Sequence, residues 1–532
     1  MRILVFHGYL LRGTGSNVYN AEIAAALVRL GHEVHLLCQD RDPLELDFVD
    51  AAGDWDRGAL RVQERRRPAR CTVYRPNIGG LLPVYVADRY AGIDARPFPE
   101  LDDEELARYL EANVAAVREV ADGARPDVAL ANHLVMGPAI LARALAERVP
   151  YAIKVHGSAL EYTVKPHPRF LPYAHEGVAA ARAVLVGSRH TAESLWAALD
   201  DPDLPAKTRL GPPGVDVHAF EPRAPAQARA GIERLIAGLA RGAAGRPATP
   251  APAAVPDDSS FATDPAAAAA ALRSLRPARD RLVAFVGKLL LAKGVDLLLA
   301  AWPLVVERVP EARLVVVGFG GYRAGSERLV AALAAADLEA LRALADRGRA
   351  EEGGPPGRLH MLGSLLDRLQ ADPAARERYL RAAPTAAGRI AFTGRLEHGE
   401  LADLLPACEA MAVTSTFPEA FGMVAAEGAA CGVLPVSAHH SGLAEVSDAL
   451  AAAVPEPARE WLAFALGDQA VEDLADRLVA WLLAPPQARR ETRAALVDTV
   501  RARWSWEGVA RGILAAAEGR LDELPGLEFP PP

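Results

Sequence analysis

The amino-acid sequence predicts an α/β protein built from two doubly wound domains, and two observations support this prediction. At 532 residues the chain is longer than a single hydrophobic core usually grows, so we expect two large domains. Short apolar runs alternate with helical segments along the first part of the chain, and the same alternation begins again near residue 281. Such alternation is typical of parallel sheets covered by helices on both faces.

The first domain is predicted over residues 1–215 and opens with a βαβ unit. An apolar strand at residues 3–7 leads into a glycine loop with Gly13 and Gly15, and a helix with one apolar face follows at residues 18–30. Later strands and a helix continue this pattern, at residues 33–37, 127–131, 138–148, 151–155 and 183–186. We therefore predict a Rossmann-like domain with a parallel sheet.

The second domain is predicted over residues 281–490, after a linker at residues 216–280. Ala, Pro, Gly and Arg dominate the linker, which contains a low-complexity insertion without apolar periodicity. The second domain repeats the organisation of the first and carries a mostly helical insertion at residues 322–388. Its strands are expected at residues 281–286, 313–317, 390–392, 411–414 and 433–436.

Composition and charge limit the classes of function. The chain is 51% hydrophobic and 24% charged, which is typical of a soluble globular protein, and its net charge of -9 argues against nucleic acid as a partner. Cys38, Cys71, Cys408 and Cys431 lie far apart, so we expect neither disulfides nor a zinc site. Neither a signal-peptide pattern nor an apolar run of membrane-spanning length is found, so we expect a cytoplasmic protein.

One basic run departs from this acidic balance. Residues 61–70 contain five arginines, namely Arg61, Arg65, Arg66, Arg67 and Arg70. Such a run could make a peripheral contact with an anionic membrane surface or with a polyanionic acceptor. The simpler interpretation is a solvated loop.

Two glutamates separated by seven residues are candidate ligand-binding residues. Glu419 lies in a bend after a predicted strand, and Glu427 lies in the Ala-rich helix that follows. The bend is at the carboxyl edge of the sheet, where open α/β folds bind ligands. The helix-start amides around Gly422, Met423 and Val424 favour an anion, and diphosphate fits there. The carboxylates could accept hydrogen bonds from hydroxyls on either side of the diphosphate, Glu427 from a ribose hydroxyl and Glu419 from a sugar hydroxyl. Alternatively, Glu427 only interacts with the helix dipole and Glu419 is a solvated loop acid.

Two lysines in a second strand-to-helix loop strengthen the diphosphate hypothesis. Lys288 and Lys293 belong to the segment Gly-Lys-Leu-Leu-Leu-Ala-Lys-Gly at residues 287–294, the first strand-to-helix turn of the second domain. A lysine about 4 Å from a phosphate oxygen is stabilising by about 4 kcal/mol at an effective dielectric constant of 20, before desolvation is subtracted. Two such cations can replace a metal ion beside a diphosphate.

Together these motifs resemble the retaining glycosyltransferases of family 4, also called glycosyl transferases group 1, which have GT-B architecture. The resemblance covers most of the chain outside the two insertions. It implies two Rossmann-like domains facing a central cleft, with a nucleotide-diphosphate sugar as donor. In that family a Glu-x7-Glu motif and a basic pair after the first strand of the C-terminal domain bind the donor. These motifs match Glu419 with Glu427 and Lys288 with Lys293.

The resemblance also implies roles for other segments. His156, in a Val-His-Gly segment after a strand, would contact the donor sugar near the scissile bond, whereas such a histidine by itself is often structural. Gly13 and Gly15 resemble a loop that approaches the phosphates and the acceptor, although they lack the third glycine of a dinucleotide motif. Arg395 lies in a turn that resembles the nucleobase-binding segment. Residues 491–532 resemble the final helix that returns toward the first domain.

Two positions depart from the family pattern. Lys288 stands where arginine is usual, which replaces a bidentate fork with a point charge. Ser441 and Gly442 stand where paired glycines are common, so the resemblance does not define the donor contacts near His440.

The resemblance therefore implies transfer of a sugar, with retention, to a hydroxyl of an unidentified carbohydrate, lipid or small-molecule acceptor. His156, Glu419 and Lys293 are the expected catalytic residues, and no cofactor or metal is expected. Asp201 and Asp203 match an Asp-x-Asp metal motif, but their Pro-rich surroundings predict a surface turn. Two alternatives are an inactive GT-B-fold binding or regulatory protein and a nucleotide-sugar epimerase on the same fold.

Overall fold

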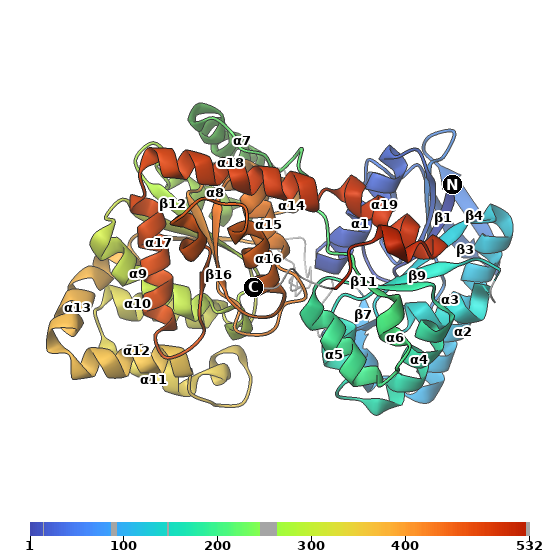
Figure 1. Ribbon diagram of the computed structural model, residues 1–532, viewed down its shortest axis with the longest axis horizontal. Helices are drawn as coiled ribbons and strands as arrows, with labels where there is room; N and C mark the ends of the chain where they lie inside the picture. Colours follow the sequence, from blue (N-terminus) through green and yellow to red (C-terminus); the bar gives the residue numbers. More distant parts are fainter. Residues whose placement is uncertain (14, 87–92, 146–147, 245–262, 528–532) are drawn as a thin grey trace. The chain divides into compact units, whose positions relative to one another are not determined.

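The computed structural model describes residues 1–13, 15–86, 93–145, 148–244 and 263–527 (Figure 1). The chain divides into two compact units. Unit 1 contains Met1–Gly214 and Trp504–Pro532, and unit 2 contains Val215–Arg503. Both units are α/β structures whose main sheets are parallel or nearly so, which confirms the predicted fold class.

Unit 1 is built on a nine-stranded sheet with the order β11-β10-β9-β8-β1-β2-β5-β3-β4. Its neighbouring strands are parallel except for β3 and β4. The chain proceeds from β1 to β2 on one side and from β8 to β11 on the other, so the loops after β1 and β8 adjoin at a switch point. The strands are β1 (Arg2–Phe6), β2 (Glu33–Leu37), β3 (Ala51–Asp56), β4 (Ala59–Glu64), β5 (Cys71–Arg75), β8 (Val128–Asn132), β9 (Tyr151–Lys154), β10 (Ala183–Val186) and β11 (Thr208–Leu210).

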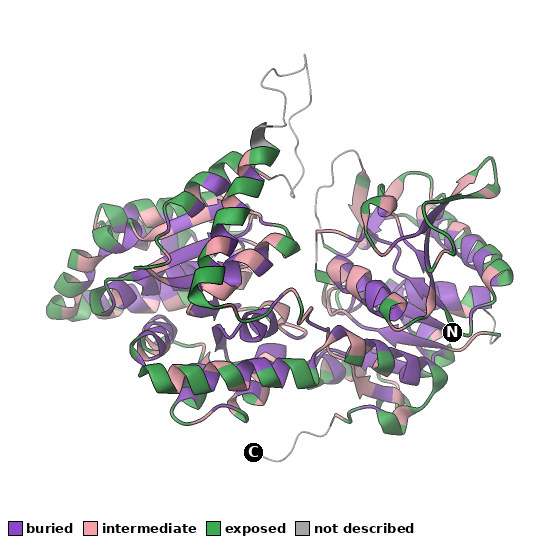
Figure 2. Cartoon of the chain, turned by 90° about the horizontal axis from the view of Figure 1, so that it is seen from above, coloured by how far each residue is buried: buried purple, intermediate pink, exposed green. Residues whose placement is uncertain are grey.

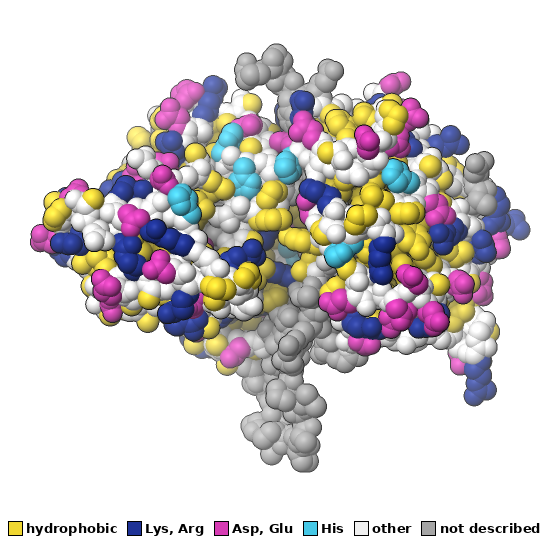
Figure 3. All heavy atoms as spheres, turned by 90° about the horizontal axis from the view of Figure 1, so that it is seen from below, with side chains coloured by type: hydrophobic (Ala, Val, Ile, Leu, Met, Phe, Trp, Pro, Cys, Tyr) yellow, Lys and Arg dark blue, Asp and Glu magenta, His cyan; other side chains and the backbone are white. Residues whose placement is uncertain are grey.

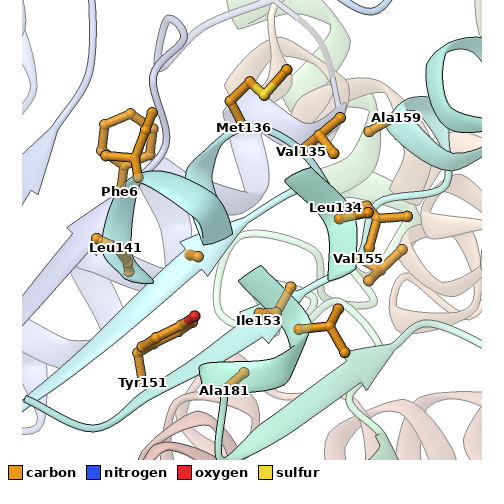
Figure 4. Close-up of a cluster of buried hydrophobic side chains, with 14 of the residues drawn as sticks. Phe6, Leu134, Val135, Met136, Leu141, Tyr151, Ile153, Val155, Ala159 and Ala181 are labelled. Carbon is orange, nitrogen blue, oxygen red and sulfur yellow. The ribbon is translucent and has the colours of Figure 1, made fainter. Parts of the chain in front are cut away.

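Helices cover this sheet, and apolar strand residues pack beneath them. Figure 4 shows Phe6, Ile153 and Val155 in one buried cluster with Leu141 of α3 (Gly137–Leu145). A separate pair of strands, β6 (Leu81–Val84) and β7 (Asp94–Pro97), completes the strands of the described part of unit 1. The other helices are α1 (Gly15–Arg29), α2 (Asp103–Ala124), α4 (Leu171–Ala180), α5 (Arg189–Leu199), α6 (Leu204–Lys207) and α19 (Trp506–Glu518).

Unit 2 is built on a six-stranded parallel sheet with the order β14-β13-β12-β15-β16-β17. Helices lie on both faces, and the strands are buried, as Figure 2 shows. The strand order reverses between β12 and β15, so the loops that follow these two strands adjoin at the carboxyl edge. The strands are β12 (Arg281–Val286), β13 (Ala312–Val317), β14 (Ile390–Gly394), β15 (Ala410–Val413), β16 (Leu434–Ala438) and β17 (Ala463–Phe464).

The helices of unit 2 include those of the insertion between β13 and β14. Four helices occupy the segment where the sequence predicts a helical insertion, namely α10 (Arg323–Ala334), α11 (Leu338–Arg347), α12 (His360–Ala371) and α13 (Pro373–Ala387). The others are α7 (Pro225–Ala244), α8 (Pro265–Arg273), α9 (Val295–Arg308), α14 (His398–Leu404), α15 (Met423–Ala430), α16 (Ser441–Ala451), α17 (Ala470–Leu483) and α18 (Pro486–Arg503).

The segment 216–280 differs from the simple linker that its composition suggests. It contains α7 and α8, which pack against one another, and α7 also packs against α14 of unit 2. Arg223 and Arg234 both pair with Asp403 of α14, at 2.5 and 2.8 Å. The low-complexity part of this segment lies outside the described residues.

The C-terminal segment changes units near Trp504. The predicted boundary at residue 491 falls inside α18, which belongs to unit 2, whereas α19 belongs to unit 1. There α19 packs against α1, and Trp506 lies edge-on to Tyr19 with ring centroids 5.4 Å apart.

The five arginines of the basic run contact other groups of the protein. Three form ion pairs, Arg61 with Asp56, Arg66 with Asp50 and Arg67 with Glu64, while Arg65 donates to backbone carbonyls that include that of Val49 and Arg70 donates to the carbonyl of Gly31. Figure 3 shows Lys and Arg side chains interspersed with Asp and Glu on the face in view. Membrane contact through this run stays a prediction. Among the described residues, we find no helix with the length and apolar character needed to span a bilayer.

Candidate functional site

The two predicted donor-binding loops adjoin at the switch point of the unit 2 sheet. One loop follows β12 and carries Lys288 and Lys293, and the other follows β15 and carries Glu419. Lys293 forms an ion pair with Oε1 of Glu419. The two side chains are 34% and 23% exposed, so a ligand can reach this pair from solvent.

Backbone hydrogen bonds hold the lysine loop in place. Thr414 Oγ1, directly after β15, donates to the carbonyl of Lys293 at 2.9 Å. On the other side of the loop, the Leu291 amide donates to Oε2 of Glu352 at 2.9 Å. Glu352 comes from the helical insertion, and nothing in its sequence surroundings indicates this contact. The insertion therefore helps to position the loop that carries the two lysines.

Glu419 is fixed by its own loop and by the start of α16. Ser415 Oγ donates to Oε1 of Glu419 at 2.6 Å, and the Glu419 amide donates to Ser441 Oγ at 2.9 Å. The Gly442 amide donates to the carbonyl of Glu419 at 2.9 Å. A Cβ on Gly442 would lie 2.7 Å from backbone atoms of residues 419–421, so only glycine permits this approach.

Ser441, one of the two departures from the family pattern, is accommodated in the left-handed region with a φ of 49°. His440 Nε2 donates to the Ser415 carbonyl at 2.7 Å, which leaves its Nδ1 to accept from Ser441 Oγ at 3.1 Å. His440, Ser415 and Ser441 thus support the Glu419 loop, and sequence reasoning did not identify this support.

Helix α15 begins directly after the Glu419 loop. Gly422 precedes it with a φ of 115°, and a Cβ there would lie 2.5 Å from Cδ2 of Leu443. The start of this helix carries no side-chain cap, so the first-turn amides that include Met423 and Val424 are available to an anion. Diphosphate binding at Gly422, Met423 and Val424 stays a prediction.

Glu427 is more buried than a solvated helix acid. Its side chain is 5% exposed, and Oε1 accepts a hydrogen bond from His398 Nε2 at 2.9 Å. Its Oε2 makes no hydrogen bond within the described residues. His398 opens α14 after β14, where Arg395 lies with its side chain 14% exposed and paired with Glu397 at 2.8 Å. The structure therefore gives Glu427 a histidine partner that the sequence did not indicate.

The remaining predicted residues, Gly13, Gly15 and His156, lie in unit 1. Gly13 has a φ of 103°, and Gly15 is the first residue of α1 with open space where a Cβ would be. His156 follows β9, and its Nε2 donates to Oδ1 of Asn132 at 2.9 Å. The Asn132 amide nitrogen donates to the Phe6 carbonyl, so the amide atom that faces His156 is the accepting oxygen. His156 Nε2 therefore carries the hydrogen, and Nδ1 carries the lone pair.

Burial keeps His156 neutral. Desolvation lowers its pKa well below the usual value, and repulsion from the protonated forms of His133, Lys154 and His7 lowers the pKa further. His133 lies with its ring centroid 4.9 Å from that of His156. Lys154, on β9, is buried, donates to the Gly211 carbonyl at 2.5 Å and has its pKa lowered to about 7 by desolvation. The sequence analysis did not identify this cluster; a lysine inside an otherwise apolar strand is the feature of the sequence that points to it.

This histidine cluster should make unit 1 sensitive to acid. Burial lowers the pKa of His7 to about 4, so the folded state stays unprotonated there while the unfolded chain binds a proton near pH 6.5. The free energy of unfolding is therefore highest above pH 6.5 and falls as the pH decreases to 4. The decrease is about 3 kcal/mol for His7 alone. The thermal unfolding midpoints of the wild type and of His7→Gln, measured between pH 7 and 4.5, test this. The midpoint of the variant should depend less on pH than that of the wild type. Equal slopes would contradict the assignment, and the exposed His175→Gln serves as the control.

The candidate metal motif lies apart from these residues, in a turn. The Asp203 amide donates to Asp201 Oδ1 at 3.0 Å just before α6. Within the part of the chain that the structure describes, no group of three or more His, Cys, Asp or Glu side chains is placed to hold a metal ion.

Comparison with known proteins bears on both units. A family model described as a glycosyl transferase 4-like domain matches residues 14–200. A second, glycosyl transferases group 1, matches residues 272–347 and 349–495. Relatives named D-inositol 3-phosphate glycosyltransferase are 27% identical: that of Frankia alni is matched over 79% of this chain and 82% of its own, and that of Xylanimonas cellulosilytica over 81% and 77%.

Solved structures share the fold. Sucrose-phosphate synthase of Thermosynechococcus elongatus superimposes with a TM-score of 0.56 at 17% identity, over 98% of this chain and 99% of its own. Anabaena HepE in complex with UDP and glucose superimposes with a TM-score of 0.55 at 15% identity, over 98% and 100%. The family models together match most of the chain, which therefore belongs to glycosyltransferase family 4, the glycosyl transferases group 1, and is an enzyme with the GT-B fold.

Proposed function

We propose that the protein transfers a sugar, with retention at the anomeric carbon, from a nucleotide-diphosphate sugar to a hydroxyl of an acceptor. The observation that carries this proposal is the pairing of Lys293 with Glu419 beside the uncapped start of α15. Cations and oriented amides there suit a diphosphate, and a carboxylate next to them suits the hydroxyls of the attached sugar. The solved Anabaena HepE complexes with UDP and glucose and with UDP-glucose support such a donor.

Each residue has one role in this proposal. Lys288, Lys293 and the amides of Gly422, Met423 and Val424 bind the diphosphate. Glu427 accepts from a ribose hydroxyl through Oε2, while His398 orients the carboxylate through Oε1. Arg395 belongs to the nucleobase segment. The family resemblance also assigns Gly13 and Gly15 to the phosphates and His156, through Nδ1, to the sugar.

The Lys293 and Glu419 pair gives the site a free and a bound state. Without ligand, the two side chains neutralise one another. A bound diphosphate competes with Glu419 for Lys293, because a charge-assisted contact to phosphate replaces the one to carboxylate. Glu419 then accepts hydrogen bonds from the sugar hydroxyls. Donor binding thus places both catalytic groups at once.

The reaction needs no nucleophile from the protein. The acceptor oxygen forms a bond to the anomeric carbon on the face from which the diphosphate leaves, and the departing phosphate oxygen takes the acceptor proton. Lys293, Lys288 and the α15 amides stabilise the negative charge that grows on the leaving group. His156 remains neutral and contributes a hydrogen bond rather than a charge.

The acceptor has the chemistry of a small polyol or sugar in this proposal. The relatives from Frankia alni and Xylanimonas cellulosilytica are named for inositol 3-phosphate, and a solved neighbour is a sucrose-phosphate synthase. Transfer assays should therefore begin with phosphorylated polyols and sugars. Detection of a glycosylated product would test the proposal, and release of nucleotide diphosphate without product would limit the activity to hydrolysis.

The two glutamates should separate in binding experiments. We expect Glu427→Ala to weaken calorimetric binding of free UDP by about 10-fold or more, because a hydrogen bond to a charged group is lost. Glu419→Ala should leave UDP affinity unchanged and impair only use of the intact donor. Equal losses of UDP affinity in both variants would refute this division. The melting temperatures of the two variants, compared with that of the wild type, show whether either substitution disturbs the fold.

A further inference from the structure

A pocket of about 420 Å³ lies in unit 2 beside the edge strand β17, and the proposed function does not use it. Its lining includes Ser447 and Asp448 of α16, Arg459 and Glu460 near β17, and Arg477 of α17. The volume is within the range of small-molecule sites, and the lining is unusually rich in charged groups for such a site.

Most of the pocket lining lies away from the donor-binding loops; His439, which also lines the pocket, is two positions before Ser441. Helix α16 contacts the Glu419 loop through its first residues, Ser441 and Gly442. Ser447, Asp448 and Ala451 line the pocket, six to ten positions later on the same helix. At about 1.5 Å per residue, these positions are about 9–15 Å along the helix from Ser441.

Two polar groups of the pocket have no partner within the described residues. Arg477 makes no ion pair or hydrogen bond there, and its Nε is fully buried. Ser447 is 2% exposed, and its Oγ is buried without a hydrogen bond. A partly buried unpaired guanidinium and a buried hydroxyl without a partner are both unfavourable, and an anionic ligand would relieve this cost.

The other charged side chains of the pocket indicate which chemical groups the ligand carries. Arg459 pairs with Glu456 at 3.2 Å and Asp448 with His439 at 2.9 Å, while Glu460 is exposed. Two guanidinium groups suit a phosphate. The carboxylates of Asp448 and Glu460 would repel a ligand that is anionic throughout, but they accept hydrogen bonds from hydroxyls.

We propose that this pocket binds a small phosphomonoester that also carries hydroxyl groups, a sugar or polyol phosphate. Arg477, with Arg459, holds the phosphate, Ser447 donates to it, and the carboxylates of Asp448 and Glu460 accept from the hydroxyls. The site is independent of the donor, so the protein binds such a compound whether or not it also uses one as acceptor.

Calorimetry with glucose 6-phosphate as the probe tests the site in the full-length protein. The wild type should bind glucose 6-phosphate more tightly than inorganic phosphate or glucose. Arg477→Met should weaken this binding by about 10-fold or more, since a charge-assisted hydrogen bond is lost. Ser447→Ala should weaken it less. Arg490→Met, which removes the same charge from an exposed position outside the pocket, should leave it unchanged.

Two comparisons separate this site from the donor site. Lys293→Ala should retain glucose 6-phosphate binding, and Arg477→Met should retain both UDP binding and turnover. Absence of glucose 6-phosphate binding in the wild type, or equal binding by wild type and Arg477→Met, would overturn the proposal. Loss of the binding in Lys293→Ala would assign the phosphate to the donor loops instead. Failure of UDP binding in the wild type would contradict the proposed function alone.

Discussion

Replacing Lys293 with alanine is expected to lower kcat/KM by about 100-fold or more, the scale for losing one preorganised group that stabilises transition-state charge. The ion pair with Glu419 is lost as well, so in the free state only Ser415 still holds that carboxylate. Both effects act on the donor. Initial rates at varied donor concentration, together with the melting temperature, measure the loss and confirm that the fold is retained.

Lys288→Arg is the matched control for this substitution. It keeps the charge and restores the residue usual in the family, so activity should stay near that of the wild type. A fully active Lys293→Ala enzyme would refute the assignment of this lysine to the diphosphate. A collapse in Lys288→Arg would show that the loop has no room for a guanidinium fork.

The second large effect is expected at His156. His156→Ala should lower kcat by about 100-fold, because one hydrogen bond to the reacting end of the sugar is removed. Since burial holds the pKa of His156 well below its usual value, the kcat of the wild type should show no titration of this residue near pH 6.5.

The pH profile of kcat and the His156→Ala rate can be measured with one assay. His175→Ala, on the exposed side of α4 in the same unit, should have wild-type rates and serves as the control. Wild-type kcat in His156→Ala would contradict the role of this histidine. A limb near pH 6.5 that disappears in His156→Ala would show that it works as a charged group.

The meeting of Lys293 with Glu419 was only partly predictable from sequence. Apolar runs placed each loop after a parallel strand, and parallel strands present their carboxyl ends at one edge. The two loops touch because β12 lies next to β15 in the sheet. The sequence pattern does not determine this strand order, since 126 residues separate Lys293 from Glu419. The family resemblance supplied this link.

The supporting residues were beyond sequence reasoning for a similar reason. Glu352 reaches the lysine loop from the insertion, and His398 reaches Glu427 from the start of α14. Each contact depends on the path of a loop between elements, and neither residue belongs to a periodic pattern. From the sequence, Ser441 is only a departure from the family pattern.

The helix α7 was missed although its pattern was present. Ala228, Ile232, Leu235 and Leu239 are buried and recur at spacings of three and four residues, which is the stripe of an amphipathic helix. The Ala-, Arg- and Gly-rich composition around them resembles that of a linker. Composition favoured the wrong interpretation here. Whether a helix forms depends on burial of an apolar stripe, and the spacing of the apolar residues indicates that stripe where the composition does not.

Turnover of a nucleotide sugar in excess EDTA tests the central claim most directly. In the proposed function, two lysines and the α15 amides take the place of the metal ion that other glycosyltransferases use, and Asp201 and Asp203 lie in a separate turn. The account predicts the same initial rate of nucleotide diphosphate release and sugar transfer with EDTA, with added magnesium or manganese, and in the Asp201→Ala, Asp203→Ala double variant. Loss of turnover on chelation and in the double variant would contradict it.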